Sequence, residues 1–257
     1  MDKSAYTTVA PLEDASADLT PGELRAILQK ADDETKLHTL RGIIVNSLNG
    51  HPQPTLLMPI IQYVLPSKNK QIKKMLHFYW EVCPKYDDAG QLKQEMILVV
   101  NAIRNDLQHP NEYIRGSTLR FLQKIKEPEL LEPLIPSVRA CLEHRHSYVR
   151  KNAVFCIYAM YQHHESIISD APEIMLTFLA AEADSTCKRN AFVLLAHGAP
   201  QKAIDYVMDV FDTIPNMDEL MQLAVIELIR KESKGENPHR VSTVEPCVPI
   251  LSFVAAN

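Results

Sequence analysis

Four basic residues recur at one position of a repeated sequence pattern, where they could bind an anionic partner. The pattern runs from a polar turn to an apolar residue, a basic residue, two or three small or polar residues and an apolar run. The basic residues are Lys73, Arg115, Arg150 and Lys188, spaced 42, 35 and 38 residues apart. Lysine and arginine hold carboxylates and phosphates through charge-assisted hydrogen bonds. The recurrence predicts a row of cations along one face of the molecule.

These residues and their basic neighbours form the candidate basic ladder, and two interpretations of it stay open. The ladder comprises Lys73, Lys74, Arg115, Arg150, Lys151, Lys188 and Arg189. In the first interpretation the cations bond carbonyl and carboxylate groups inside the fold and stabilise its turns. In the second they form a stripe for an acidic partner or for anionic lipid headgroups.

Histidines are the other candidates for chemistry, and their spacing favours neither a metal site nor catalysis. His144 and His146 flank Arg145, and His163 and His164 are adjacent. Neither pair has the i, i+4 spacing of a helical zinc site with a carboxylate between the ligands. The seven scattered glycines exclude a Gly-rich phosphate loop, and no Gly-x-Ser-x-Gly or Cys-x-x-Cys pattern occurs. We therefore expect no enzyme, no cofactor and no metal.

One predicted helix, at residues 91–107, carries more apolar surface than a single core stripe uses. The stripe consists of Leu92, Met96, Val99, Val100, Ile103 and Leu107. Ile97 and Leu98 lie about 100° and about 200° away from Met96 around the helix axis. Either they are buried against a neighbouring repeat, or they edge an exposed apolar patch that marks a partner site.

The elements that must position these residues are almost all helices, because apolar residues from Leu19 to Ile229 follow i, i+3, i+4, i+7 spacing. Prolines recur every 12–20 residues and mark where helices end or begin. The predicted helices are 21–30, 34–48, 55–65, 69–82, 91–107, 111–125, 128–142, 146–162, 171–181, 184–197, 200–213 and 217–233. These make six pairs. An irregular period near 40 residues with two helices per repeat predicts an all-α α-solenoid of HEAT/armadillo type.

Charge and cysteine usage limit the classes of partner and compartment. The net charge is -5, and residues 1–35, with three basic and eight acidic residues, account for all of it. The remaining body is balanced, so bulk charge does not favour nucleic-acid binding. The N-terminus has no apolar signal segment, and the longest apolar run is nine residues, Ala153 to Tyr161. Five cysteines without a Cys-x-x-Cys pair favour a reducing cytosol.

The sequence divides into three regions by composition. Residues 1–19 are polar and acidic and are expected to be a disordered N-terminus, and residues 20–233 form the helical trunk. Residues 234–257 contain Pro238, Pro246 and Pro249 and lose the helical period, which predicts an irregular tail that is truncated or altered.

Long stretches of the chain resemble the N-terminal trunk of the coatomer beta-subunit family, which belongs with the large adaptor chains of clathrin coats. The likeness is densest in DLQHPNEYIRGSTLRFLQKIKEPELLEPLIPSVRACLEHRHSYVRKNAVFCIYAMY, from Asp106 to Tyr161. It continues upstream through LPSKNKQIKKMLHFYWEVCPK and QEMILVVNAIRNDL, and downstream through CKRNAFVLL and LMQLAVIELIRK. The resemblance spans roughly residues 20–232 and ends after about Lys234.

The resemblance implies an adaptin-like trunk that serves as a structural subunit of the coatomer (COPI) coat in retrograde Golgi-to-ER and intra-Golgi transport. The implied partners are other coatomer subunits, notably delta, and the GTP-bound form of the small GTPase Arf. The implied location is cytoplasmic and peripheral on Golgi membrane through those partners. The family's Arf-facing surface matches the helix at 91–107, so Ile97, Leu98 and Val100 are the candidate Arf-facing residues. A generic HEAT-repeat adaptor of another pathway is the alternative.

Overall fold

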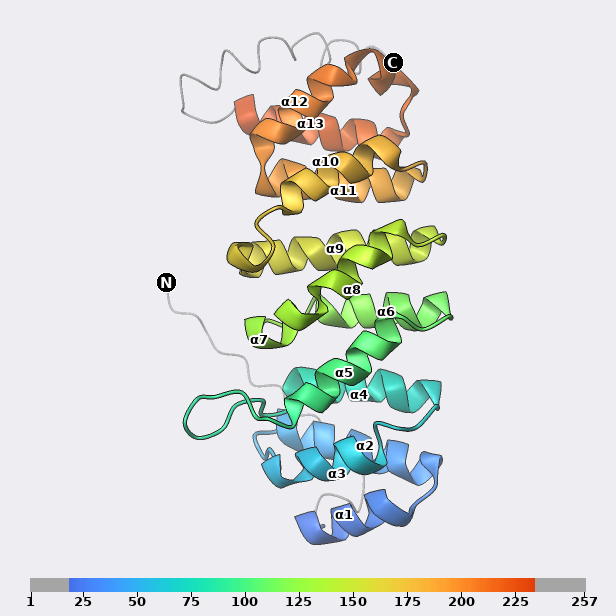
Figure 1. The fold of residues 1–257 in the computed structure, drawn as a ribbon, viewed down its shortest axis with the longest axis vertical. Coiled ribbons are helices and arrows are strands. Elements are labelled where there is room, and N and C mark those ends of the chain that lie inside the picture. Colours follow the sequence, from blue (N-terminus) through green and yellow to red (C-terminus); the bar gives the residue numbers. More distant parts are fainter. Residues whose placement is uncertain (1–18, 234–257) are drawn as a thin grey trace. The chain divides into compact units, whose positions relative to one another are not determined.

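The computed structural model describes residues 19–233, and its regular structure is helical (Figure 1). Within those residues there is no strand, and one isolated antiparallel bridge joins Tyr86 and Leu92. The all-α class predicted from the sequence is therefore confirmed. The N-terminal region expected at 1–19, except for Leu19, and the tail expected at 234–257 lie outside the described residues.

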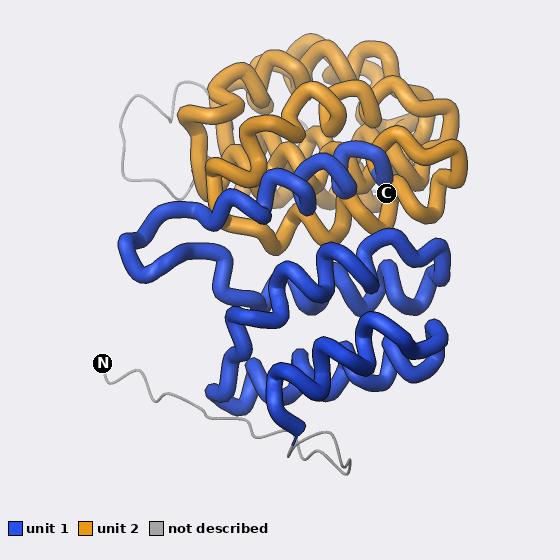
Figure 2. Tube along the Cα trace, turned by 60° about the horizontal axis from the view of Figure 1, so that its bottom comes forward, with its two compact units in different colours: residues 1–106 blue, residues 107–257 orange. Residues whose placement is uncertain are grey.

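The chain divides into two compact units, residues 1–106 and 107–257 (Figure 2). The first unit contains α1 (Pro21–Lys30), α2 (Asp33–Leu48), η2 (Pro54–Leu56), α3 (Leu57–Tyr63) and α4 (Lys70–Val82), and α5 (Met96–Leu107) ends at the boundary. The second contains α6 (Glu112–Leu122), α7 (Pro128–Leu131), η3 (Glu132–Leu134), α8 (Ile135–Ala140), η4 (Cys141–Glu143), α9 (Ser147–His163), η5 (Glu165–Ile167), α10 (Ala171–Ala181), α11 (Ser185–Gly198), α12 (Pro200–Asp209), η6 (Phe211–Asn216) and α13 (Glu219–Ser233).

Helices of the first unit begin at capped residues and share one apolar interior. The Thr20 side chain accepts a hydrogen bond from the backbone N–H of Glu23, whose carboxylate in turn accepts the Thr20 N–H, so a capping box starts α1. At the start of α2, the Asp32 carboxylate accepts the backbone N–H of Thr35. Helix α1 packs against α2 and α3, and α2 packs against α4. The helices therefore bury their apolar faces against one another.

The second unit is built of two layers of helices. Helices α6, α9, α11 and α13 form one layer, in which each helix contacts the next. Helices α8, α10 and α12 form the other layer, and each contacts α9 or α11 of the first. Neither layer could bury its apolar faces alone, which is the physical basis of repeat stacking in an α-solenoid. Cys141, Cys156 and Cys187 are free and buried in this unit, as the apolar setting of these cysteines predicts.

Each of the twelve predicted helical stretches is found, and backbone chemistry explains two differences, one at a helix start and one inside a predicted helix. The helix expected at 91–107 begins only at Met96, because residues before it form a loop in which the Asp87 carboxylate accepts the N–H groups of Ala89 and Gln91. The helix expected at 128–142 is a succession of short α and 3-10 segments. Pro133 and Pro136 lie inside it and have no N–H to donate.

Candidate interaction surfaces and the turns that carry them

Each basic residue of the repeat pattern follows, six residues later, a side chain that closes a turn. That side chain accepts the backbone N–H of the residue two positions further along the chain. The four acceptor–donor pairs are Ser67 Oγ with Asn69 (3.1 Å), His109 Nδ1 with Asn111 (3.0 Å), His144 Nδ1 with His146 (3.1 Å) and Glu182 Oε1 with Asp184 (2.8 Å). The donor residue is in every case the N-cap of the next helix. The repeats predicted from the sequence therefore match down to a single hydrogen bond.

Two arginines of the basic ladder bond the carbonyl groups of these turns. Arg115 donates from Nε to the carbonyl oxygen of His109 (2.5 Å) and from Nη2 to that of Gln108 (2.9 Å). Arg150 donates from Nη1 to the carbonyl oxygens of His144 (2.8 Å) and Arg145 (2.9 Å). A guanidinium has five donors in a planar fork, so it can satisfy carbonyl groups that a turn leaves unpaired.

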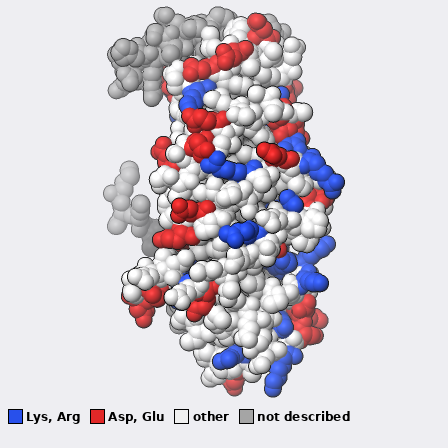
Figure 3. All heavy atoms as spheres, in the orientation of Figure 1, with Lys and Arg blue, Asp and Glu red and all other residues white. Residues whose placement is uncertain are grey.

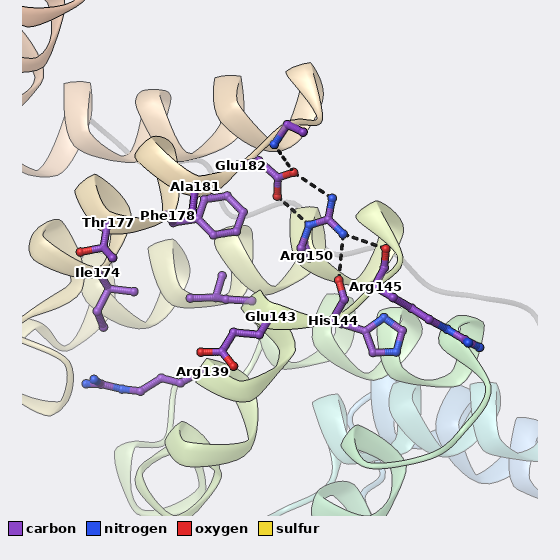
Figure 4. A pocket seen from close by; sticks show the side chains of 12 residues that line it. Arg139, Glu143, His144, Arg145, Arg150, Ile174, Thr177, Phe178, Ala181 and Glu182 are labelled. Atoms are coloured by element: carbon purple, nitrogen blue, oxygen red, sulfur yellow. Dashed lines mark hydrogen bonds and ion pairs between the residues drawn. The ribbon is translucent and has the colours of Figure 1, made fainter.

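Arg150 also forms a buried ion pair with Glu182 of the next repeat (Figure 4). Its Nε and Nη2 atoms lie 2.6 and 2.8 Å from the two carboxylate oxygens, and the Glu182 side chain is only 3 % exposed. Burial by itself raises the pKa of Glu182, but the bonds from Arg150 and from the N–H groups of Asp184 and Ala183 bring that pKa below its ordinary value. Glu182 is therefore a buried carboxylate held by its neighbours.

Lys73 is likewise engaged inside its own unit. Its ammonium group lies 2.6 Å from Oδ1 of Asp106, and both side chains are partly buried. His77, one helical turn away on α4, is half-buried. Burial lowers the pKa of His77 from 6.5 to about 4, with Asp106 opposing the shift and Lys73 adding to it.

The structure therefore places three members of the basic ladder in bonds within the chain: Lys73, Arg115 and Arg150. Of the remaining members, Lys74 is exposed, whereas Lys151, Lys188 and Arg189 are half-buried. The Lys151 ammonium lies 5.5 Å from the centre of the Tyr148 ring. On the face drawn in Figure 3, basic and acidic side chains are intermixed. A basic stripe for an acidic partner stays a prediction. It would rest on the four ladder residues Lys74, Lys151, Lys188 and Arg189.

The surplus apolar residues of α5 divide between surface and core. Ile97 and Leu98 are 61 % and 48 % exposed, so they are not buried against a neighbouring repeat, and a partner site at these two residues stays a prediction. Val100 is 6 % exposed and belongs to the core stripe with Met96 and Val99. Its burial corrects the placement of Val100 on a partner-facing surface, because no partner can reach a side chain inside the core.

The described residues show no arrangement of side chains typical of a metal centre or a membrane span. No group of three or more His, Cys, Asp or Glu residues in the described chain could hold a metal ion. His144 and His146 stack with ring centres 5.8 Å apart, and His144 serves its own turn. None of the described helices is both long and apolar enough to cross a bilayer.

Sequence reasoning located the cations and offered carbonyl and carboxylate acceptors inside the fold as one interpretation, but it did not identify which groups these are. The acceptors of Arg115 and Arg150 are main-chain carbonyl groups, which every residue type carries, so the sequence contains no direct signal for them. One signal was present, however. A residue with a polar side chain recurs six positions before each basic residue, as Ser67, His109, His144 and Glu182.

Comparison with known proteins identifies the helical array. The model of the adaptin N-terminal region matches residues 17–256. Over 233 residues the chain is 50 % identical to the coatomer subunit beta of Candida glabrata, which covers 91 % of this chain and 24 % of that protein. It is 45 % identical over 253 residues to the Saccharomyces cerevisiae coatomer subunit beta, a match that covers 98 % of this chain and 26 % of that protein. It is 52 % identical over 208 residues to the coatomer subunit beta of Rattus norvegicus, a match that covers 81 % of this chain and 22 % of that protein.

The matches cover most of this chain but only a part of each relative. The chain spans about a quarter of the length of these relatives. Among solved structures, a designed armadillo repeat protein aligns with 89 % of this chain and 98 % of its own, at 14 % identity and a TM-score of 0.45.

Proposed function

The chain belongs to the adaptin N-terminal family, and from that premise we propose that it acts as a structural subunit of the coatomer (COPI) vesicle coat. The observation that carries the proposal is identity of 45–52 % to coatomer beta subunits over most of the chain. The proposed role is retrograde Golgi-to-ER and intra-Golgi transport through protein–protein contacts. The chain contributes a scaffold and no catalytic step.

Helix stacking is compatible with a scaffold because it leaves side chains on the outer faces free for partners. Helix α11 contacts neighbours on several sides, but α9, α10 and α12 keep exposed side chains on their outer faces. We propose that other coatomer subunits, delta among them, bind such faces. Recruitment to the Golgi membrane then takes place through partners.

The apolar patch at the start of α5 is the proposed contact for Arf in its GTP-bound form. Ile97 and Leu98 are adjacent, largely exposed and apolar, which is the composition of a protein-binding patch rather than of an ordinary solvated helix face. Val100 is excluded from this contact by its burial.

A nucleotide-dependent binding assay tests the proposal. Purified chain is incubated with immobilised Arf loaded with GDP or with a non-hydrolysable GTP analogue, and separately with purified delta subunit. We expect retention by GTP-form Arf and by delta, loss of the Arf interaction in Ile97→Asp, and no loss in Met58→Asp, which changes an exposed apolar residue of α3. Equal weak binding to both nucleotide forms, unaffected by Ile97→Asp, would remove the Arf contact. Failure to retain any coatomer subunit would remove the coat assignment and favour an adaptor of another pathway.

A further inference from the structure

Helix α10 is held at both ends by arginines of the preceding repeat. Asp170, next to its first residue, accepts two hydrogen bonds from Arg139 of α8, at 2.7 and 2.6 Å. Glu182, next to its last residue, accepts two from Arg150 of α9, at 2.6 and 2.8 Å. Both pairs have the paired donor geometry that fixes position as well as charge. The helix therefore forms a wall that is tied to the preceding repeat at both ends, more tightly at buried Glu182 than at half-exposed Asp170.

This wall carries a second apolar stripe beside the one that faces the core. Ala171, Met175 and Leu179 are buried and form the core stripe. Ile174 and Phe178 each precede one of those residues, and so lie about 100° round the helix from the core stripe. Both are only half-buried, and exposed Ala181 continues their side of the helix. Ile174, Phe178 and Ala181 all line the same cavity.

The stripe lines a groove of about 690 Å³ that we call the α10 groove, bounded by Leu142, Glu143, Ile174, Thr177, Phe178 and Ala181. On the facing side, Leu142 and Glu143 belong to η4, which follows α8 directly. Figure 4 shows Ile174, Thr177, Phe178 and Ala181 along one wall and Glu143 with Arg139 across from them. Its volume falls within the range of about 300–1,000 Å³ usual for ligand sites.

Two charged side chains that line the groove form no ion pair with any described residue, and Glu143 is the one beside the apolar wall. Arg139 and Arg150 are neutralised by Asp170 and Glu182. The Arg145 side chain extends away from the apolar wall in Figure 4. Glu143 is exposed at the mouth of the groove and makes no ion pair with any described residue. A cation placed beside Glu143 would pair with its carboxylate, whereas an anionic group at that end of the groove would be repelled.

We propose that the α10 groove binds a short peptide segment of a partner protein that places large apolar side chains against Phe178 and Ile174 and a lysine or arginine beside Glu143. Residues 174–181 present a wall about 10 Å long at about 1.5 Å per residue, which matches two turns of an amphipathic helix or a few extended residues. The carboxylate at the mouth disfavours an anionic lipid surface. The site does not depend on the coat assignment.

A peptide selection with groove variants tests this site. A random library of 12-residue peptides displayed on phage is selected on the purified chain and counter-selected on Ala181→Trp, which fills the groove from an exposed position. We expect enriched sequences that combine Leu, Ile, Met or Phe with Lys or Arg. Synthetic copies should bind at least tenfold more weakly to Ala181→Trp and to Glu143→Lys. Glu132→Lys, a matched charge reversal at an exposed glutamate outside the groove, should leave binding unchanged.

The charge assignment has its own readout. Selection on Glu143→Lys should enrich peptides with Asp or Glu in place of Lys or Arg. The proposal is overturned if no sequence is enriched, if selected peptides bind Ala181→Trp as well as the parent chain, or if the parent chain selects acidic peptides. Self-association in sedimentation that Ala181→Trp abolishes would also overturn it, because the occupant would then be a second copy of the chain.

Discussion

Gly116 of α6 lies against the ring of Tyr148 of α9 so closely that no side chain fits between them. A Cβ atom built on Gly116 would lie 2.7 Å from Cδ1 and 2.9 Å from Cζ of Tyr148, and nearer still to Cε1. Contacts of this kind force a neighbour to move. The close approach of α6 and α9, which contact each other in one layer of the second unit, depends on this glycine.

Gly116→Ala should destabilise the second unit by about 2 kcal/mol, since overpacking costs more than the roughly 1 kcal/mol that alanine gains in helix propensity. Urea unfolding followed by circular dichroism measures the change. Gly22→Ala is the matched control, because a Cβ there meets nothing within 4 Å. In the double variant Gly116→Ala with Tyr148→Ala, the loss of unfolding free energy should be smaller than the sum of the losses in the two single variants. Equal effects at Gly116 and Gly22 would contradict the packing argument.

The sequence was sufficient to predict the helices but not their closest contacts. Periodicity and proline positions located every α-helix of the described residues, because both are local properties of the chain, but they gave no sign of the short 3-10 helix η5. The boundary error at residues 91–95 arose because the Asp87 side chain closes a loop there. The need for glycine at position 116 could not be predicted, since Tyr148 lies 32 positions away and becomes a neighbour only when the repeats stack.

Breaking the ion pair between Arg150 and Glu182 should cost far more than breaking the one between Arg139 and Asp170. Arg150→Met leaves a carboxylate that is 3 % exposed without its cation, for a cost of about 3–5 kcal/mol. Arg139→Met leaves Asp170, whose side chain is 50 % exposed, so water replaces the lost partner at a cost below about 1 kcal/mol. The two variants are compared by their unfolding midpoints in urea at pH 7. Similar midpoints for Arg150→Met and Arg139→Met would show that the Glu182 carboxylate is well solvated.

The basic ladder and α5 show how much of the candidate site could be predicted from the sequence. The repeat pattern identified Arg115 and Arg150 as equivalent residues, and their shared bonds to turn carbonyls confirm that equivalence. The pattern did not decide between bonding inside the chain and binding of another protein. The carboxylates that pair with Lys73 and Arg150 are Asp106 and Glu182, which lie 33 and 32 residues further along the chain, so a local pattern cannot reveal them. For Ile97 and Val100 the helical period gave the correct angles, and only packing decided which face was covered.

The half-buried His77 should make stability depend on pH in the mildly acid range. The unfolded chain binds a proton at His77 below about pH 6.5, but the folded chain does so only near pH 4, because burial disfavours the charged imidazole. The unfolded state therefore holds more protons between these values, and folding stability falls as the pH is lowered. Between pH 6.5 and 5 the loss should be about 2 kcal/mol.

Urea unfolding at half-unit pH steps measures this slope. His77→Gln should flatten it, whereas the same change at exposed His51 should leave it unaltered. A slope that persists in His77→Gln would place the titrating group elsewhere.

Substitutions on α5 should separate the surface role of Ile97 from the core role of Val100. Ile97→Asp and Leu98→Asp place a charge on side chains that are 61 % and 48 % exposed, so each should change the free energy of unfolding by no more than about 0.5 kcal/mol. Val100→Asp buries a carboxylate at a position that is 6 % exposed and should cost more than about 4 kcal/mol. Thermal and urea unfolding measure stability, and retention by GTP-form Arf measures binding of those variants that remain folded. The expected pattern is loss of binding without loss of stability at Ile97 and Leu98, and loss of folding at Val100. If Ile97→Asp also unfolded the chain, the apolar patch would be part of the interior rather than a surface for a partner.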